Sequence, residues 1–286
     1  MLELLINPKR AERQPWQMGI VGLLFGIIAM FAADKIFASD PVLSQYSTIF
    51  VILFSVILTI PYIYYTIKYE ERKDVTIDNE FKLLREHSRA IFAFIWLFIG
   101  FVLAFSIYYI VMPNSGNLLK AQVETFCQIN RGSNYQECLK QYGSGINVVT
   151  GQVTGKERFF SIFSNNMAVL IFTIVLSLLF GAGAIFILAW NASVIAAAMS
   201  IYVKSNLAQL PQGFARYMLF HGIPEIAAYF VGALAGGILS LAIIRRDLKG
   251  EKVWNILQDA LYLVIVAIII LILAGFIEVY ITPLLI

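Results

Sequence analysis

Long apolar runs separated by short charged segments dominate the pattern of the chain. Crossing the hydrocarbon core of a bilayer, about 30 Å thick, takes roughly 20 residues of helix. Apolar windows of this length predict six transmembrane helices, over residues 17–33, 42–67, 90–112, 163–188, 217–244 and 260–280. The pattern therefore predicts an all-α, polytopic integral membrane protein.

One apolar run is too long for a single straight helix. Residues 159–203 contain no Asp, Glu, Lys or Arg over 45 positions, which is about twice the length of one span. A helix break near Trp190 and Asn191 is expected, because the Asn191 side chain can accept hydrogen bonds from the free N–H groups that begin a helix. Residues 192–203 then form a short seventh helix or, alternatively, a re-entrant hairpin.

The basic residues favour a crossing over a hairpin. They gather in three clusters, within residues 9–13, 68–89 and 245–252. Cytoplasmic loops of membrane proteins carry an excess of Lys and Arg. If all three clusters are cytoplasmic, the chain must cross twice between Leu188 and Arg245. The expected topology is about seven helices in the cell membrane, one of them short, with a cytoplasmic N-terminus and an extracytoplasmic C-terminus.

Composition supports this class and sets limits on partners. Hydrophobic residues make up 59% of the chain and charged residues 14%, against about 25% charged in soluble proteins. The linker over residues 68–89 has six acidic and six basic residues, so we expect a solvated helical connector without affinity for nucleic acid or anionic lipid. The chain then divides into residues 1–89, an anchor with two helices and the linker, and residues 90–286, a five-helix membrane domain.

The largest loop expected outside the membrane spans residues 113–158 and holds both cysteines. Thiols on the outer face oxidise, so Cys127 and Cys138 are candidates for a disulfide that closes a short loop. Two unpaired cysteines are the alternative. A metal site is not expected there, because the loop has only these two ligands and no histidine.

The only ionisable pair inside an apolar run is His221 and Glu225, four residues apart and so on one face of a helix. Pro224 is expected to open this helix, with Glu225 in its first turn, where the helix dipole favours a carboxylate. A charged group inside a membrane costs roughly 3 kcal/mol, so it is expected to be paired, to line a cavity or to act chemically. Structural pairing, ligand or proton handling, and catalysis all remain open.

Small residues recur at the spacing that lets two helices approach closely. Gly22 and Gly26 form one GxxxG motif, and Gly232 and Gly236 form another. We expect both motifs to lie at helix contacts, and the fourth, fifth and sixth helices to form one compact unit.

Four features occur in a characteristic order. They are Asn165 and Asn166 at the end of an aromatic segment, the Gly-rich residues 180–183, Asn191 before a small-residue stretch, and His-Gly-Ile-Pro-Glu over residues 221–225. Together they resemble the stage II sporulation protein M family, over about residues 90–280. The chain departs from the usual Asn-Gly and Pro-His-Gly of that family, and its two extra N-terminal helices make it similar to members found in archaea.

The resemblance implies a non-enzymatic role. In endospore-forming bacteria these proteins act with partner cell-wall hydrolases in septal thinning and engulfment, and they localise the other components. We therefore expect a scaffold without cofactor or metal, which contacts membrane lipids, positions membrane or cell-envelope proteins, binds no nucleic acid and is compatible with a homo-oligomer. Its expected polar contacts between helices involve six residues: Asn165, Asn166, Asn191, His221, Gly222 and Glu225.

The alternative is a transporter or channel component with a polar site around His221 and Glu225. A water-filled cavity that reaches Glu225 would favour transport. A dry, hydrogen-bonded cluster would oppose it.

Overall fold

The computed structural model describes residues 7–37, 40, 42–76, 80–112, 118–124, 155–180, 184–205, 211, 219–220, 222–244 and 251–285. Within these ranges the chain is helical apart from short turns, and it contains no β-strand. The main helices are α2 (Pro8–Arg13), α3 (Trp16–Phe37), α4 (Ser47–Thr76), α5 (Glu80–Val111), α8 (Gly155–Phe180), α9 (Ala184–Ser205), α11 (Ile223–Ile244) and α12 (Glu251–Phe276). The shorter elements are η1 (Leu43–Tyr46), η6 (Ile277–Ile281) and α13 (Thr282–Leu285).

The predicted class is confirmed. Among the described residues, six helical stretches are long and apolar enough to cross a membrane: Trp16–Phe37, Leu43–Glu70, Glu86–Val111, Ile162–Leu179, Ile223–Ser240 and Trp254–Ile281. A seventh apolar stretch, Ile185–Ser200, is shorter. The fold is thus an all-α membrane bundle of about seven spans, one of them short.

The predicted break at Asn191 is wrong. Helix α9 runs from Ala184 to Ser205 and continues through Asn191 without a break. The Asn191 side chain donates from Nδ2 to the Ile187 carbonyl oxygen at 2.7 Å, one turn earlier in the same helix. Because its amide is satisfied inside α9, it does not act as a cap.

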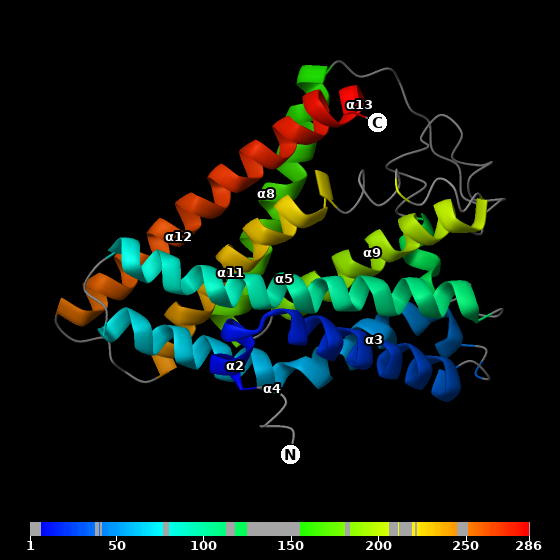
Figure 1. The fold of residues 1–286 in the computed structure, drawn as a ribbon, viewed down its shortest axis with the longest axis horizontal. Helices are drawn as coiled ribbons and strands as arrows, with labels where there is room; N and C mark the ends of the chain where they lie inside the picture. The colour runs from blue at the N-terminus through cyan, green and yellow to red at the C-terminus, as the bar shows by residue number, and fades with distance from the viewer. Residues whose placement is uncertain are drawn as a thin grey trace.

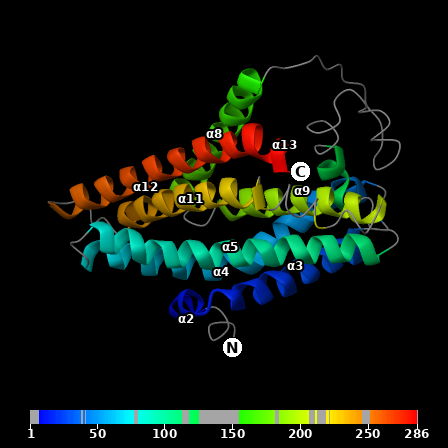
Figure 2. The same ribbon diagram turned by 45° about the horizontal axis from the view of Figure 1, so that its top comes forward.

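The helices lie in tiers. Figure 2 shows α2 and α3 on one side, α4 and α5 in the middle, and α9, α11 and α12 on the other side, with α8 crossing obliquely. Helix α5 packs most extensively on α3 and also contacts α9, whereas α11 packs on α8 and α12. Helix α9 therefore joins α5 more closely than it joins α8 or α11, which differs from the expected compact unit.

Successive helices run between the two ends of the bundle in alternating directions. The end of α4, the start of α5, the end of α11 and the start of α12 lie together at one end, on the left of Figure 1. The ends of α3, α5 and α9 lie at the opposite end. The helix ends that flank the second and third basic clusters thus share one end of the molecule, as the charge pattern predicts if both clusters lie on the same side of the membrane.

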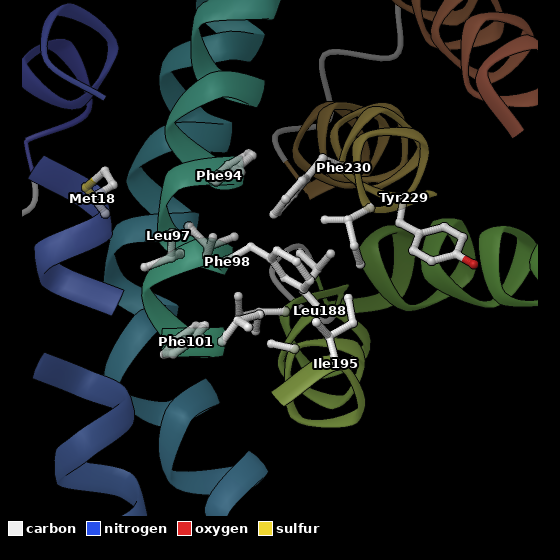
Figure 3. Packing of buried hydrophobic residues seen from close by; sticks show 14 of the residues in the cluster. Met18, Phe94, Leu97, Phe98, Phe101, Leu188, Ile195, Tyr229 and Phe230 are labelled. Carbon is white, nitrogen blue, oxygen red and sulfur yellow. The ribbon is translucent and has the colours of Figure 1, made fainter. Parts of the chain in front are cut away.

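Aromatic side chains fill the space between α5, α9 and α11. The rings of Phe94 and Phe230 stack with centroids 5.0 Å apart, and both side chains are buried. Figure 3 shows the cluster around them, with Leu97, Phe98 and Phe101 from α5 and Leu188 and Ile195 from α9. Lipid tails are as apolar as these groups, so close van der Waals fit holds the helices together here.

Both GxxxG motifs lie at helix contacts, as predicted. A Cβ atom added at Gly22 would lie 2.3 Å from the Leu97 carbonyl oxygen on α5, and one added at Gly100 would lie 2.2 Å from the Gly19 carbonyl oxygen on α3. At the second motif, an added Cβ at Gly236 would lie 2.5 Å from the Ile174 carbonyl oxygen on α8. Only glycine allows these backbones to approach so closely.

We expect Gly100→Ala to destabilise the protein by about 1–3 kcal/mol, because the new methyl group overlaps the α3 backbone and forces the two helices apart. Thermal unfolding of the purified protein in detergent measures this. Gly155→Ala is the matched control, since the nearest atom to its added Cβ is 3.7 Å away. Equal melting temperatures for wild type and Gly100→Ala would show that the contact is not tight.

Candidate functional site

The polar groups inside the membrane meet where α8 passes α11. Helix α11 begins at Ile223 and carries Glu225 in its first turn, as predicted from Pro224. Asn166 lies about one turn into the α8 segment that spans the membrane, Ile162–Leu179. The helix start places free backbone N–H groups and the positive end of the α11 dipole near the Glu225 carboxylate.

Three side chains form a hydrogen-bonded chain across this contact. Asn166 donates from Nδ2 to Glu225 Oε1, and the Tyr229 hydroxyl donates to Asn166 Oδ1 at 2.9 Å. The exposed fractions are 7% for Asn166, 6% for Glu225 and 1% for Tyr229. The Asn166 amide therefore uses both of its polar ends: its NH₂ group donates to the Glu225 carboxylate, and its carbonyl oxygen accepts from the Tyr229 hydroxyl. We call these residues the polar triad.

The polar triad continues the glycine contact. Glu225, Tyr229, Gly232 and Gly236 follow one another at spacings of three or four residues, so they form one stripe along α11. An added Cβ at Gly232 would lie 2.4 Å from Leu170 Cδ1, which is four residues beyond Asn166 on α8. Figure 3 shows the Tyr229 ring turned away from the aromatic cluster around Phe230 and toward α8. The contact thus joins α8 to α11 by hydrogen bonds at one end and by glycine packing along its length.

The structure brings together only part of the predicted set. Asn166 and Glu225 meet, and Gly222 is buried just before α11. Asn165 is exposed and Asn191 bonds within its own helix. His221, Cys127 and Cys138 lie outside the described residues, so the disulfide and the role of His221 stay predictions.

Tyr229 was missed by sequence reasoning. Its position in the sequence could have indicated its role. It lies four residues after Glu225 and three before Gly232, on the helix face that the GxxxG motif assigns to a helix contact. A tyrosine that is buried in a membrane helix needs a partner for its hydroxyl, and Asn166 provides it.

A second buried polar cluster lies at the other side of the bundle and was not predicted. Lys73 Nζ of α4 is 2.7 Å from Glu70 Oε1 on the same helix and 2.9 Å from Glu12 Oε2 on α2. His87 Nδ1 of α5 is 2.8 Å from the other oxygen of Glu70. The Lys73 and Glu12 side chains are 8% and 7% exposed, and the Glu70 side chain is fully buried. We call Glu12, Glu70, Lys73 and His87 the charged cluster.

The charged cluster corrects the expected solvated connector. Helix α4 extends beyond its span to Thr76, and α5 begins at Glu80, so most of the linker is helical, as expected. However, α2 covers the helix pair, and its Glu12 closes the cluster over Lys73. Glu70, Lys73 and His87 are consequently buried between three helices and not solvated.

Burial shifts the ionisation of the two cluster residues that lie outside the spans. Burial and, to a smaller extent, the neighbouring Glu70 carboxylate raise the pKa of Glu12 to about 7, against the opposing effect of Lys73. For Lys73, burial opposes the charged form, but the Glu70 and Glu12 carboxyl groups together outweigh burial and raise the pKa of the ammonium group. Among the described residues, no group of three or more His, Cys, Asp or Glu is arranged to hold a metal ion.

The fold and the polar triad define a class, a polytopic α-helical membrane protein whose spans are tied together by buried polar contacts. The family described as Stage II sporulation protein M matches residues 18–283, which is nearly the whole chain. The chain therefore belongs to the stage II sporulation protein M family. The match begins in α3, so it includes the two N-terminal spans and extends beyond residues 90–280. No curated protein and no solved structure matches the chain significantly.

The predicted division at residue 89 stays a prediction, although α5 runs through this position as one helix.

We expect Asn166→Ala to lower the stability of the detergent-solubilised protein by about 1–3 kcal/mol, because it removes the partner of both the Glu225 carboxylate and the Tyr229 hydroxyl. Asn165→Ala, at the exposed neighbouring position, should change stability by less than about 0.5 kcal/mol. Thermal unfolding of the two variants side by side measures the difference. Equal effects would mean that the polar triad contributes nothing specific.

The pKa of Glu12 predicts a pH dependence. Its ordinary value is 4.5 and its value in the folded protein is about 7, so the folded state binds the proton more tightly than the unfolded chain does. The stability that this proton contributes is full below pH 4.5 and is lost as the pH rises through 7. We expect the melting temperature to fall from pH 5 to pH 8 and Glu12→Gln to flatten this fall.

Glu124→Gln, which changes a carboxylate outside the charged cluster, is the control and should leave the profile as in wild type. An identical pH profile for wild type and Glu12→Gln would exclude the buried, proton-binding state of Glu12.

Proposed function

We propose that this protein is a non-enzymatic membrane scaffold that positions other membrane or cell-envelope proteins. The observation that carries the proposal is the polar triad. The single carboxylate at the start of α11 is 6% exposed and accepts a hydrogen bond from Asn166, so it is engaged in joining two helices. Membership of the stage II sporulation protein M family supports the same role.

The lipid-facing surfaces of the outer helices support it as well. Only 22% of the α8 span and 33% of the α3 and α12 spans are buried inside the molecule. Phe172 on α8 and Phe276 on α12 are about half exposed, at 52% and 50%. Such faces are available to the helices of a partner or to a second copy of this chain, and close packing in lipid would hold them together.

The proposal includes an orientation. The helix ends that flank the second and third basic clusters meet at one end of the bundle, which the excess of Lys and Arg in cytoplasmic loops assigns to the cytoplasm. The membrane would then be the cell membrane, with the N-terminus inside and the C-terminus outside.

Transport is the competing function, and the polar triad argues against it. A transporter needs its ionisable group to face a water-filled route at some stage of the cycle. The Glu225 carboxylate is buried against α8 and is followed along α11 by a glycine contact that leaves no room for a side chain.

Site-specific photo-cross-linking tests the scaffold. A photoreactive phenylalanine analogue is placed at Phe172, or at Phe276, in the full-length chain within native membranes. We expect cross-links to one or a few reproducible protein partners, because these side chains face outward. The same analogue at Phe101, which is 1% exposed, is the matched control and should give no cross-link to another protein.

The scaffold proposal would be contradicted if the analogue at both exposed positions gave only random cross-links to lipid. If the purified protein in liposomes carried a substrate-dependent flux, and Glu225→Gln abolished it, the proposed scaffold function would have to be replaced by transport.

A further inference from the structure

A cavity of about 280 Å³ lies where α2 packs against α4. Its lining consists of Asn7, Pro8, Lys9, Tyr65, Lys68, Tyr69 and Arg72. Among the described residues that line it, three are cations from two helices, and none is a carboxylate. They are separate from the residues of the polar triad.

Two of the lining cations, Lys9 and Lys68, have different neighbours from the carboxylates of the charged cluster. The carboxyl groups of Glu12 and Glu70 turn toward Lys73 in the charged cluster, where they are buried. Lys9 and Lys68 instead face aromatic rings, with Lys9 Nζ 5.6 Å from the centroid of Tyr69 and Lys68 Nζ 5.9 Å from that of Tyr64. The cavity therefore gathers three cations, two of them from a linker whose net charge is zero.

The cavity lies at the boundary of the membrane. The α4 span ends at Glu70, so Tyr65, Lys68 and Tyr69 belong to its last turns and Arg72 lies just beyond it. Exposed aromatic residues mark the same level, with Tyr64 and Tyr65 at 45% and 43% exposed and Trp16 at 52% as the first residue of α3. Tyrosine and tryptophan concentrate at the level of the lipid headgroups.

We infer that this cavity binds the phosphate headgroup of an acidic phospholipid. Lys9, Lys68 and Arg72 supply the positive charge, Asn7 and the tyrosine hydroxyls supply neutral polar groups, and the boundary position lets the acyl chains stay in the bilayer beside α4. Basic pockets between transmembrane helices at headgroup level recognise acidic lipids in this way. The charged cluster assists by holding α2, and with it Lys9, against α4 through the contact of Glu12 with Lys73.

The test uses the full-length protein in nanodiscs of phosphatidylcholine with increasing fractions of phosphatidylglycerol. Native mass spectrometry after release counts the phosphatidylglycerol molecules that stay bound. Each cation near the membrane surface is worth about fivefold in affinity, so Lys9→Gln, Lys68→Gln and Arg72→Gln should each lose about fivefold and the triple variant about a hundredfold. Added salt should weaken wild-type binding in the same direction.

Lys35→Gln is the matched control, because it removes one exposed lysine at the far end of α3 and should leave binding unchanged. A melting profile like that of wild type establishes that the triple variant is folded. If it does not fold, the three single variants carry the test.

Two results would overturn the inference. One is equal retention of phosphatidylglycerol by wild type and the cavity variants, or a loss of phosphatidylglycerol binding in Lys35→Gln as large as that in the cavity variants. The other is tight binding of inorganic phosphate by the lipid-free protein in detergent that phosphatidylglycerol does not displace, which would make the cavity a site for a free anion.

Discussion

The contact between α8 and α11 depends on a constraint that the bilayer imposes on every polar group within it. In a lipid-facing span no water is available to hydrogen-bond a carboxylate, an amide or a phenol, so each must find a partner inside the protein. Asn166 meets this requirement for both Glu225 and Tyr229, which lie 59 and 63 residues later in the sequence on another helix. Separating α8 from α11 would expose all three groups to hydrocarbon, so the polar triad opposes separation more strongly than apolar packing alone.

The glycines of α11 then allow α8 and α11 to pack closely. Gly232 and Gly236 let the α8 backbone approach along the same stripe that begins with Glu225, so polar pairing and close packing act on one interface. The α3 and α5 helices use glycine packing in the same way, through Gly22 and Gly100. Helix α5 connects the two contacts, because its aromatic residues stack against α11 while its other face packs on α3. A bundle built in this manner is held internally and leaves α8 and α12 largely open to lipid or to partners.

Much of the fold could be predicted from apolar length and charge, and the exceptions have physical reasons. The spans and the start of α11 at Pro224 follow from local rules that act within one helix. The break in the long apolar run was assigned to Asn191 because asparagine caps helices, yet its amide finds a partner in the preceding turn, and only the structure decides between these two hydrogen bonds. Glu12, Glu70 and His87 come from three helices that no sequence spacing relates. Their burial depends on α2 folding back over the helix pair, which is a property of tertiary packing.

The most direct measurement of the central claim is a double-mutant cycle between Asn166 and Glu225. The free energies of unfolding of Asn166→Ala, Glu225→Ala and the double variant, compared with wild type, isolate the energy of their interaction. If these side chains tie α8 to α11, the two substitutions are non-additive, with a coupling energy of about 1–2 kcal/mol. Additive effects within about 0.3 kcal/mol would contradict the account, because they would show that the carboxylate and the amide stabilise the protein independently.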